Sequence, residues 1–457
     1  MTHTNAPPPP GVPLLKVLPR LLKDPPNVLT GLARGAGDGP LRLGAGPASV
    51  YVVTHPDHVQ HVLVENNRNY WKGRLFNRAS FVFGRGLVLN EGEHWLAQRR
   101  LMSPAFGHQR VAALVPIMAA VVRKKIARWE AQARAGRPVE LVREMMQVTL
   151  EVIARTMFSA GVTDADVARI AAAFGVLLEH MSLRFNTFFL PEALPLPGAR
   201  RARAALAELE GIVARVVAGR RAAGERPGDL LTMLLDARGE DGAPMSERQL
   251  RDEVVTTLFG GYEATADALA WTWHLLATNP RAEARLRFEV ETEVAGEEPA
   301  FDELVRLEYT RRVAQESMRL LPPFWWILRS ALGDDVVGGR RVPAGATVLL
   351  LLYATHRHLG FWDHPEAFDP DRFLPERVAA RHRHAYLPFG AGQRACIGRH
   401  LAMLEIPLVL AMLARRFRLA PVPGRPVTVR ALASLRARDG IWMRLERVER
   451  PSAVEVG

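Results

Sequence analysis

The chain has 457 residues, 48% of them hydrophobic, a formal net charge of +12 and a single cysteine. One cysteine excludes an internal disulfide framework and fits a reducing compartment, so we expect a cytoplasmic protein in which Cys396 serves reactivity or ligation. The basic residues are scattered and accompany no nucleic-acid-binding motif, which argues against a nucleic acid partner. No apolar run reaches the roughly 18 residues of a bilayer-spanning helix, so no membrane anchor is expected.

The chain shows no flexible linker, internal repeat or low-complexity block, which predicts one domain over residues 1–457. We expect the polar, proline-rich stretch from Met1 to Pro13 to be disordered. Two short strands are predicted between Leu41 and Thr54, and a helical pattern begins at Asp57. From Val111 to Gly239 the pattern is mainly helical, with breaks at Gly136, Gly161, Pro191 to Gly198, and Gly224.

The most informative helix is predicted to start at Ser246, where Ser-Glu-Arg-Gln has the form of a capping box, and to continue to Asn279 before Pro280. At 1.5 Å per residue it would be roughly 50 Å long and would cross most of a domain of this size. It contains Gly260-Gly261, and each glycine costs a helix roughly 1 kcal/mol relative to alanine. Close approach of a cofactor and helix packing both explain the pair.

Strand patterns return after Gly333. They cover Asp335 to Val342, Thr347 to Leu352, Thr428 to Leu435 and Gly440 to Leu445. Helices nevertheless dominate, which predicts a mainly α fold with small β-sheets, of the α+β class.

The stretch from Phe389 to Gly398, FGAGQRACIG, combines flexible backbone, one cation and one thiol. Its glycines allow tight turns, and Arg394 can pair with a carboxylate. Cys396 lies where a helical pattern begins, and backbone amides at a helix start favour the thiolate that binds a metal. An inert buried thiol is the alternative for an isolated cysteine.

This stretch resembles the haem-binding loop of cytochromes P450, written FxxGxRxCxG, at all five fixed positions. The resemblance implies that family's single triangular domain, with haem b (iron protoporphyrin IX) ligated by Cys396. It implies a monooxygenase that inserts oxygen from O₂ into a lipophilic small molecule. The expected cofactor-binding residues are Phe389, Gly390, Gly392, Arg394, Cys396, Gly398, Trp95, Arg99, Arg329, Gly260 and Gly261.

Two further motifs resemble those of the family. Glu316 and Arg319 match its ExxR helix, and Arg372 matches the arginine that completes an ion-paired structural triad. Trp95 and Arg99 match the WxxxR helix, which would hydrogen-bond a haem propionate, and Arg329 is similarly placed. With these matches the resemblance extends over almost the whole chain.

The segment Gly260 to Thr265 resembles the family's oxygen-activation motif, in which an acid followed by an alcohol delivers protons. Glu263 and Thr265 are therefore the expected catalytic residues. The position directly after the acid, usually threonine, is Ala264, and Thr265 lies about 100° further round the helix. Either water organised by Glu263 and Thr265 carries the protons, or a substrate hydroxyl fills the gap at Ala264.

The resemblance also implies a pocket for a terpenoid, steroid, fatty acid or macrolide-like substrate, although aromatic clusters of this kind also form plain core. The expected lining residues are Phe83, Phe188, Phe259, Tyr262, Ala264, Trp325 and Trp326. Electrons would come from a separate ferredoxin or flavodoxin with its NAD(P)H reductase, docking on a monomer near Arg99, Arg100, Arg394 and Arg399.

Two other functions stay open on the sequence. One is a haem-thiolate enzyme that uses peroxide or isomerises its substrate, which Glu263 disfavours and Ala264 allows. The other is a haem-binding or ligand-binding scaffold without turnover. Turnover with peroxide alone would identify the first, and haem binding without NADPH consumption would identify the second.

Overall fold

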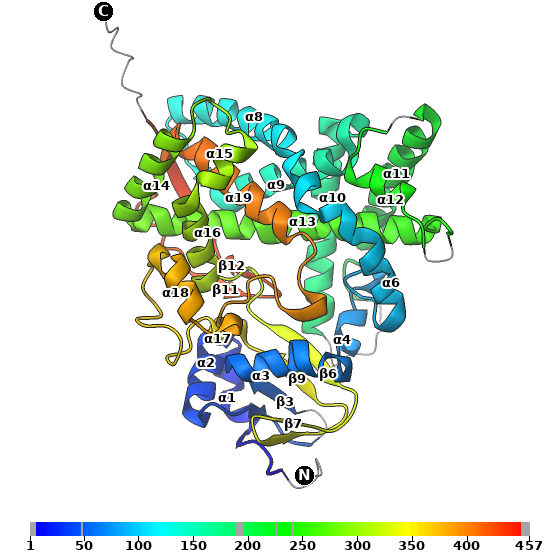
Figure 1. Cartoon of the computed structure of the whole chain (residues 1–457), viewed down its shortest axis with the longest axis vertical. Helices are drawn as coiled ribbons and strands as arrows, with labels where there is room; N and C mark the ends of the chain where they lie inside the picture. The colour runs from blue at the N-terminus through cyan, green and yellow to red at the C-terminus, as the bar shows by residue number, and fades with distance from the viewer. Residues whose placement is uncertain (1–5, 47–48, 188–195, 225, 240–241, 449–457) are drawn as a thin grey trace, which may run out of the picture.

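The computed structural model describes residues 6–46, 49–187, 196–224, 226–239 and 242–448. Helices form one end and the centre of the molecule, and the largest sheet lies at the other end (Figure 1). The predicted mainly α fold with small sheets is confirmed. The longer helices are α8 (Val115–Arg134), α9 (Leu141–Phe158), α10 (Asp164–Asn186), α11 (Ala199–Ala223), α13 (Glu247–Thr278), α14 (Pro280–Glu293), α16 (Glu308–Leu320) and α19 (Arg399–Ala414).

Helix α13 crosses the middle of the molecule and is about 48 Å long at 1.5 Å per residue (Figure 1). Its start follows the prediction, because the Ser246 hydroxyl accepts a hydrogen bond from the Gln249 amide at 3.2 Å. The Gln249 side chain does not complete a capping box. It donates to Glu253 Oε1 at 2.6 Å, which ties the first turn to the second.

The largest sheet has six strands in the order β1-β2-β3-β9-β6-β4. The predicted strands near Leu41 and Thr347 are its members β2, β3 and β9, whereas β6 was not predicted. Disorder was predicted from Met1 to Pro13, but strand β1 lies in this stretch and pairs in parallel with β2, with Gly11 opposite Arg42. The prediction is therefore wrong for β1. Residues 1–5 lie outside the described part of the chain. The strands are β1 (Gly11–Val12), β2 (Leu41–Leu43), β3 (Val50–Val53), β4 (Tyr70–Trp71), β6 (Ile327–Ala331) and β9 (Thr347–Leu350).

The remaining strands form small antiparallel sheets. The hairpin of β11 and β12 bears on the site, because its second strand packs against α13: the Trp271 indole donates to the Leu435 carbonyl at 2.9 Å. These strands are β5 (Val139–Glu140), β7 (Asp335–Val337), β8 (Arg340–Val342), β10 (Phe417–Pro421), β11 (Val429–Ala431), β12 (Leu435–Ala437) and β13 (Trp442–Arg447). Of these, β5 and β10 were not predicted.

No single helix in the described ranges is both long and apolar enough to cross a bilayer. One bent pair of helical segments reaches the required length and apolar composition only when the two segments are counted together. The pair is Gly92–Phe106 and His108–Arg134.

Candidate active site

The loop before α19 is shaped by its glycines. Gly390 and Gly392 have φ of 68° and 67°, which side chains disfavour, and a Cβ on Gly392 would lie 2.1 Å from the Leu63 carbonyl oxygen. The backbone of Cys396 donates to the Phe389 carbonyl at 2.8 Å, which closes the loop. Helix α19 begins at Arg399 with Gly398 as its N-cap, so Cys396 lies just before a helix start as predicted.

The thiol of Cys396 is accessible, yet the surrounding protein desolvates it. Burial raises the pKa of Cys396, while the Gly398 amide, Arg99 and Arg399 lower it. Arg99 comes from α6 (Gly92–Met102), and burial lowers its own pKa against the opposing effect of Cys396. A cation bound to the sulfur would remove the cost of burying the thiolate, so this environment suits a metal ligand.

Three cations gather beside this loop. Arg394 forms an ion pair with Glu91, donates to the Asn90 carbonyl at 2.6 Å and covers the Trp95 ring at 3.9 Å. Burial and the Arg394 charge lower the pKa of Arg329, which is 7% exposed, to about 10. Burial, with the charges of Arg394 and Arg329, lowers the pKa of Lys72 to about 7.

This group of Lys72, Arg329 and Arg394 has one carboxylate, Glu91, which already accepts from the backbone of Lys72 at 2.7 Å. Over the described ranges neither Lys72 nor Arg329 has an ion-pair partner, so the group carries two positive charges in excess when Lys72 is protonated. Lys72 and Arg329 line a cavity of about 960 Å³. Such a site suits a ligand with two carboxylates, and the two propionates of haem fit it.

Lys72 and Glu91 are not among the residues predicted from the sequence. Lys72 is one of only five lysines in a chain that uses arginine at nearly every other basic position, and it follows the aromatic Trp71. The use of a rare lysine beside an aromatic residue is the one sequence signal that could have identified Lys72. Nothing local distinguishes Glu91 from a surface acid.

The two glycines of α13 have different neighbours. A Cβ on Gly260 would meet nothing within 4 Å, whereas one on Gly261 would lie 2.7 Å from the Ile153 side chain of α9. The geometry therefore favours helix packing for Gly261, and close approach of a cofactor remains an explanation only for Gly260. Ala264 lies one turn after Gly260 on the same face and is partly exposed.

Thr265 lies one turn after Gly261, on the side of α13 that packs against α9, and is 6% exposed. Glu263 is buried and points to the β11–β12 hairpin. It accepts from the Ser434 hydroxyl at 3.0 Å and forms an ion pair with Arg436. The two expected catalytic residues therefore lie in different environments, and only Glu263 has partners that connect it to a charged network.

The structure brings Glu316, Arg319 and Arg372 together. Glu316 and Arg319 are 0% exposed and form two hydrogen bonds of 2.6 and 2.8 Å, and Arg372 Nε lies 3.3 Å from the Glu316 carboxylate. Arg319 also donates to the carbonyls of Pro365 at 2.7 Å and Ala367 at 3.0 Å. The triad fastens the segment that leads to the Cys396 loop.

Three of the expected pocket residues belong to the core. Phe83 and Tyr262 join an aromatic cluster in which Phe83 lies 4.9 Å from Phe259 and Tyr262 stacks on Phe174 at 5.1 Å. Trp325 is buried, and its indole donates to the Leu432 carbonyl at 2.8 Å. These contacts favour core packing for the three side chains, and their place in the substrate pocket stays a prediction. Phe259, Ala264 and Trp326 are partly exposed, and Phe188 lies outside the described residues.

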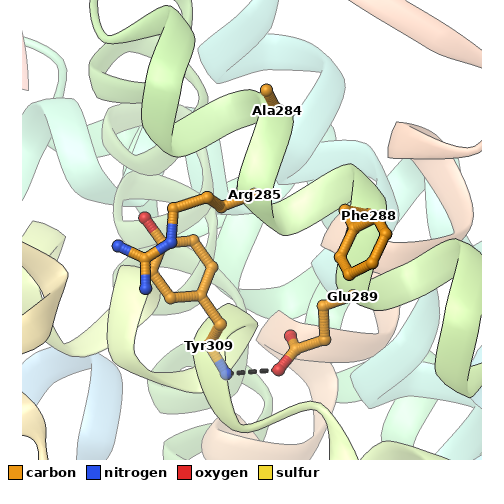
Figure 2. A pocket seen from close by; sticks show the side chains of 5 residues that line it. All are labelled: Ala284, Arg285, Phe288, Glu289 and Tyr309. Atoms are coloured by element: carbon orange, nitrogen blue, oxygen red, sulfur yellow. Dashed lines mark hydrogen bonds between the residues drawn. The ribbon is translucent and has the colours of Figure 1, made fainter.

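A separate cavity of about 380 Å³ lies between α14 and α16 (Figure 2). Its polar groups are engaged in structure: Glu289 accepts from the backbone of Tyr309 and Thr310 at the start of α16, and Arg285 covers the Tyr309 ring at 4.1 Å. Arg285 also pairs with Asp371 at 2.8 Å. This cavity holds none of the predicted site residues.

Comparison with known proteins agrees with this geometry. A family model described as Cytochrome P450 matches residues 7–434. The chain is 36% identical to cyclooctatin synthase of Streptomyces melanosporofaciens, covering 95% of this chain and 94% of the relative. It is 37% identical to cyclooctat-9-en-7-ol 5-monooxygenase of the same organism, covering 91% and 90%. It is 34% identical to pentalenene oxygenase of Streptomyces avermitilis, covering 86% and 87%.

Among solved structures, the chain is similar to the crystal structure of the cytochrome P450DA heme domain. The TM-score is 0.87 at 26% sequence identity, with 97% of this chain and 98% of that chain covered.

Proposed function

The chain belongs to the cytochrome P450 family and is a haem-dependent monooxygenase of lipophilic molecules, and we propose that its substrate is a terpenoid that already carries a hydroxyl group. Three relatives of 34 to 37% identity oxidise terpenoids. One of them has a name that specifies an alcohol as substrate. The observation that carries the proposal is Ala264, which leaves a place for a substrate hydroxyl on the Gly260 face of α13.

We assign the haem to the space between the Cys396 loop and α13. Cys396 would ligate the iron through its sulfur, and Lys72, Arg329 and Arg394 would neutralise the propionates. When bound, a thiolate-ligated haem supplies the activation of dioxygen. Trp95 and Arg99 of α6 support this arrangement, because Trp95 lies under Arg394 and Arg99 lowers the pKa of Cys396.

The residues of α13 would then have two roles, proton transfer and making space for the substrate. Glu263, held by Ser434 and Arg436, is the acid that gives and regains protons behind the reaction site. Gly260 and Ala264 leave space on the neighbouring face. Because Thr265 lies on the α9 side, it does not supply the hydroxyl missing at Ala264, which favours the substrate hydroxyl over water organised by Thr265.

Introducing a hydroxyl with Ala264→Thr tests this assignment. The new side chain would occupy the place of the substrate hydroxyl, so we expect an alcohol substrate to bind about 5-fold more weakly, since one hydrogen bond is worth about 1 kcal/mol. We also expect the fraction of electrons recovered in product to rise for a substrate that lacks the hydroxyl. Spectral titration and product per NADPH measure both. The isosteric control Thr265→Val should change neither, and equal behaviour of the two variants would contradict the proposal.

Substrate class is tested by the spin-state shift of the haem on titration. A cyclic terpenoid alcohol, the corresponding hydrocarbon and a fatty acid of similar size are compared with wild-type protein. We expect the largest shift and the tightest binding with the alcohol. A preference for the fatty acid would reject the terpenoid proposal and leave the monooxygenase class intact.

We further propose that a ferredoxin or flavodoxin docks on the thiolate side. Of the four arginines expected there, Arg394 is engaged by Glu91 and Arg99 is partly buried, whereas Arg100 and Arg399 are exposed. Charge of this kind acts mainly on the rate of association.

Reversing these two charges in Arg100→Glu/Arg399→Glu should slow reduction by an acidic ferredoxin at low ionic strength by at least about tenfold, because steering is worth that much or more. Stopped-flow reduction across a salt series measures the effect. The control Arg444→Glu changes an exposed arginine of β13 and should leave the rate unchanged. A slowing that persists at high salt would show that the variant damages the site instead of docking.

A further inference from the structure

A second carboxyl group, Asp267, lies behind the reaction site, one turn after Glu263 on α13. Asp267 is 1% exposed and Glu263 is 7% exposed. Both face the β11–β12 hairpin, where Arg436 Nε lies 3.6 Å from Asp267 Oδ2 and also donates to the Ser434 hydroxyl at 3.1 Å. Arg436 therefore lies beside both acids, and Ser434 connects Arg436 with Glu263.

The two carboxyl groups and the guanidinium cannot all be charged as they would be in water. Two buried carboxylates face one guanidinium, and the other titratable group beside them is the Tyr262 phenol, whose pKa is raised well above its ordinary value by burial. With both acids ionised the cluster would carry an uncompensated negative charge on two buried carboxyl groups. The cluster is neutral when it holds one proton, as in other pairs of close carboxyl groups.

The contacts indicate which acid holds the proton. Glu263 has both the ion pair with Arg436 and the hydrogen bond from Ser434. In the described part of the chain, neither oxygen of Asp267 has a partner within hydrogen-bond distance. Burial, only partly offset by Arg436, raises the pKa of Asp267 to about 7. Asp267 is therefore the member of the pair that holds the proton below about pH 7 and loses it above that value.

The position of Asp267 connects it to the reaction site. It follows Ala264 by three residues and Gly260 by seven, and seven residues return a helix to within about 20° of the same face. The chain thus lacks the hydroxyl at position 264 and has an additional acid one turn beyond. Asp267 itself does not reach the open face, because it is almost fully buried.

We infer that Asp267 and Glu263 share one proton across Arg436 and Ser434, and that Asp267 is a positioning residue that reprotonates Glu263 during turnover. In this step one proton leaves the Asp267 carboxyl and arrives at the Glu263 carboxylate, so the charge exchanges between two groups that face the same arginine. No electron is transferred. The second half of the inference rests on the proposed monooxygenase function, whereas the first half does not.

The competing explanation is that Asp267 only anchors the β11–β12 hairpin to α13. The substitution Asp267→Asn separates the two, because asparagine has the shape and polarity of a protonated aspartic acid but cannot release a proton. A structural role should survive it. The matched control is Glu405→Gln on α19. Glu405 is a buried carboxyl group whose Oε1 has no hydrogen-bond partner among the described residues and whose pKa burial raises well above its ordinary value.

The first measurement is infrared spectroscopy of the purified holoprotein at pH 6 and pH 8. We expect carbonyl absorption of protonated carboxylic acids that weakens between these values in wild type and in Glu405→Gln and is reduced in Asp267→Asn. The part that remains in Asp267→Asn is assigned to Glu253, whose pKa burial also raises to about 7. If Asp267→Asn retains every protonated-acid band of wild type, Asp267 is ionised and the inference is wrong. This readout does not depend on substrate or turnover.

The second measurement is product formed per NADPH from pH 6 to pH 8, with the solvent isotope effect. Acid assistance is worth about 100-fold or more, so loss of the group that resupplies the acid should lower the coupled fraction by about tenfold in Asp267→Asn. In wild type the fraction should fall as pH rises through about 7, and in Asp267→Asn it should be low and flat. Ser434→Ala, which removes no charge, should lower coupling less and retain the infrared band.

An infrared change without any change in coupling, pH profile or isotope effect would overturn the reprotonation role and leave only the shared proton. Failure of wild type to oxygenate any substrate would reject the proposed function, and the infrared result would still decide whether the pair holds a proton. If Asp267→Asn does not bind haem, coupling and the isotope effect are compared between wild type and Ser434→Ala, and no difference between them would overturn the reprotonation role.

Discussion

The variant Cys396→Ser is expected to lose the strongly red-shifted Soret band that reduced thiolate-haem proteins show under carbon monoxide. Serine has nearly the same size as cysteine, so the loop can keep its shape, but its hydroxyl does not ionise near neutral pH. Since loss of outer contacts to a metal ligand typically costs 10- to 100-fold in activity, loss of the ligand itself should cost more than about 100-fold. The spectrum and product formation measure the two effects.

The reason lies in the surroundings of the sulfur. Burial opposes the Cys396 thiolate, and the Gly398 amide, Arg99 and Arg399 favour it. All three favour negative charge on a sulfur and do little for a neutral hydroxyl. The control Ala395→Ser places a hydroxyl at the neighbouring position and leaves the thiol in place, so its spectrum should match wild type. A red-shifted band in Cys396→Ser, or its loss in both variants, would reject Cys396 as the ligand.

The parts of the site that the sequence predicted depend on local signals. The loop from Phe389 to Gly398 is contiguous, and its glycines and its position before a helix are visible without tertiary structure. The start of α13 follows from a capping residue, and its end from a proline. The strands at Leu41, Thr347 and Trp442 follow from alternating patterns between turn residues. Each of these features is decided by residues within a few positions of one another.

Contacts between distant segments could not be predicted in this way. Glu263 and Arg436 are separated by 173 residues, and nothing in the hairpin sequence indicates which acid its arginine meets. The same holds for Lys72 and Arg329, which the sheet brings to one cavity. Charge on a single residue predicts neither its partner nor its burial, so these clusters become visible only when the fold is known.

Hydrophobic type also does not distinguish a pocket from a core. Phe83, Tyr262 and Trp325 have the composition of a ligand pocket, but each also contacts other aromatic side chains. The glycine pair likewise shows that a motif does not predict the surroundings of each of its residues. Neighbouring positions on a helix point about 100° apart, so Gly260 and Gly261 meet different surroundings although they share one motif.

The second large effect is expected from Glu316→Gln, which removes the one carboxylate of the buried triad. Burial raises the pKa of Glu316, but Arg319, the Asp369 amide and Arg372 oppose this: the first two donate hydrogen bonds to the carboxylate and Arg372 forms an ion pair with it. The ionised form therefore fits the site. Loss of its charge leaves Arg319 buried without a counter-ion, which typically costs about 3 to 5 kcal/mol of unfolding free energy.

This cost should appear as failure to hold the segment from His356 to Arg372, whose carbonyls Arg319 binds. Urea unfolding of the holoprotein, followed by the Soret band and by circular dichroism, measures it. The control Glu293→Gln makes the same change in a more exposed ion pair, in which Arg306 Nε lies 2.9 Å from the Glu293 carboxylate. That ion pair should contribute less than about 1 kcal/mol to the free energy of unfolding. Equal losses in the two variants would mean that the triad does not fasten this segment. A much larger loss in Glu316→Gln, with early release of haem, would show that the buried charges secure the structure on which the Cys396 loop depends.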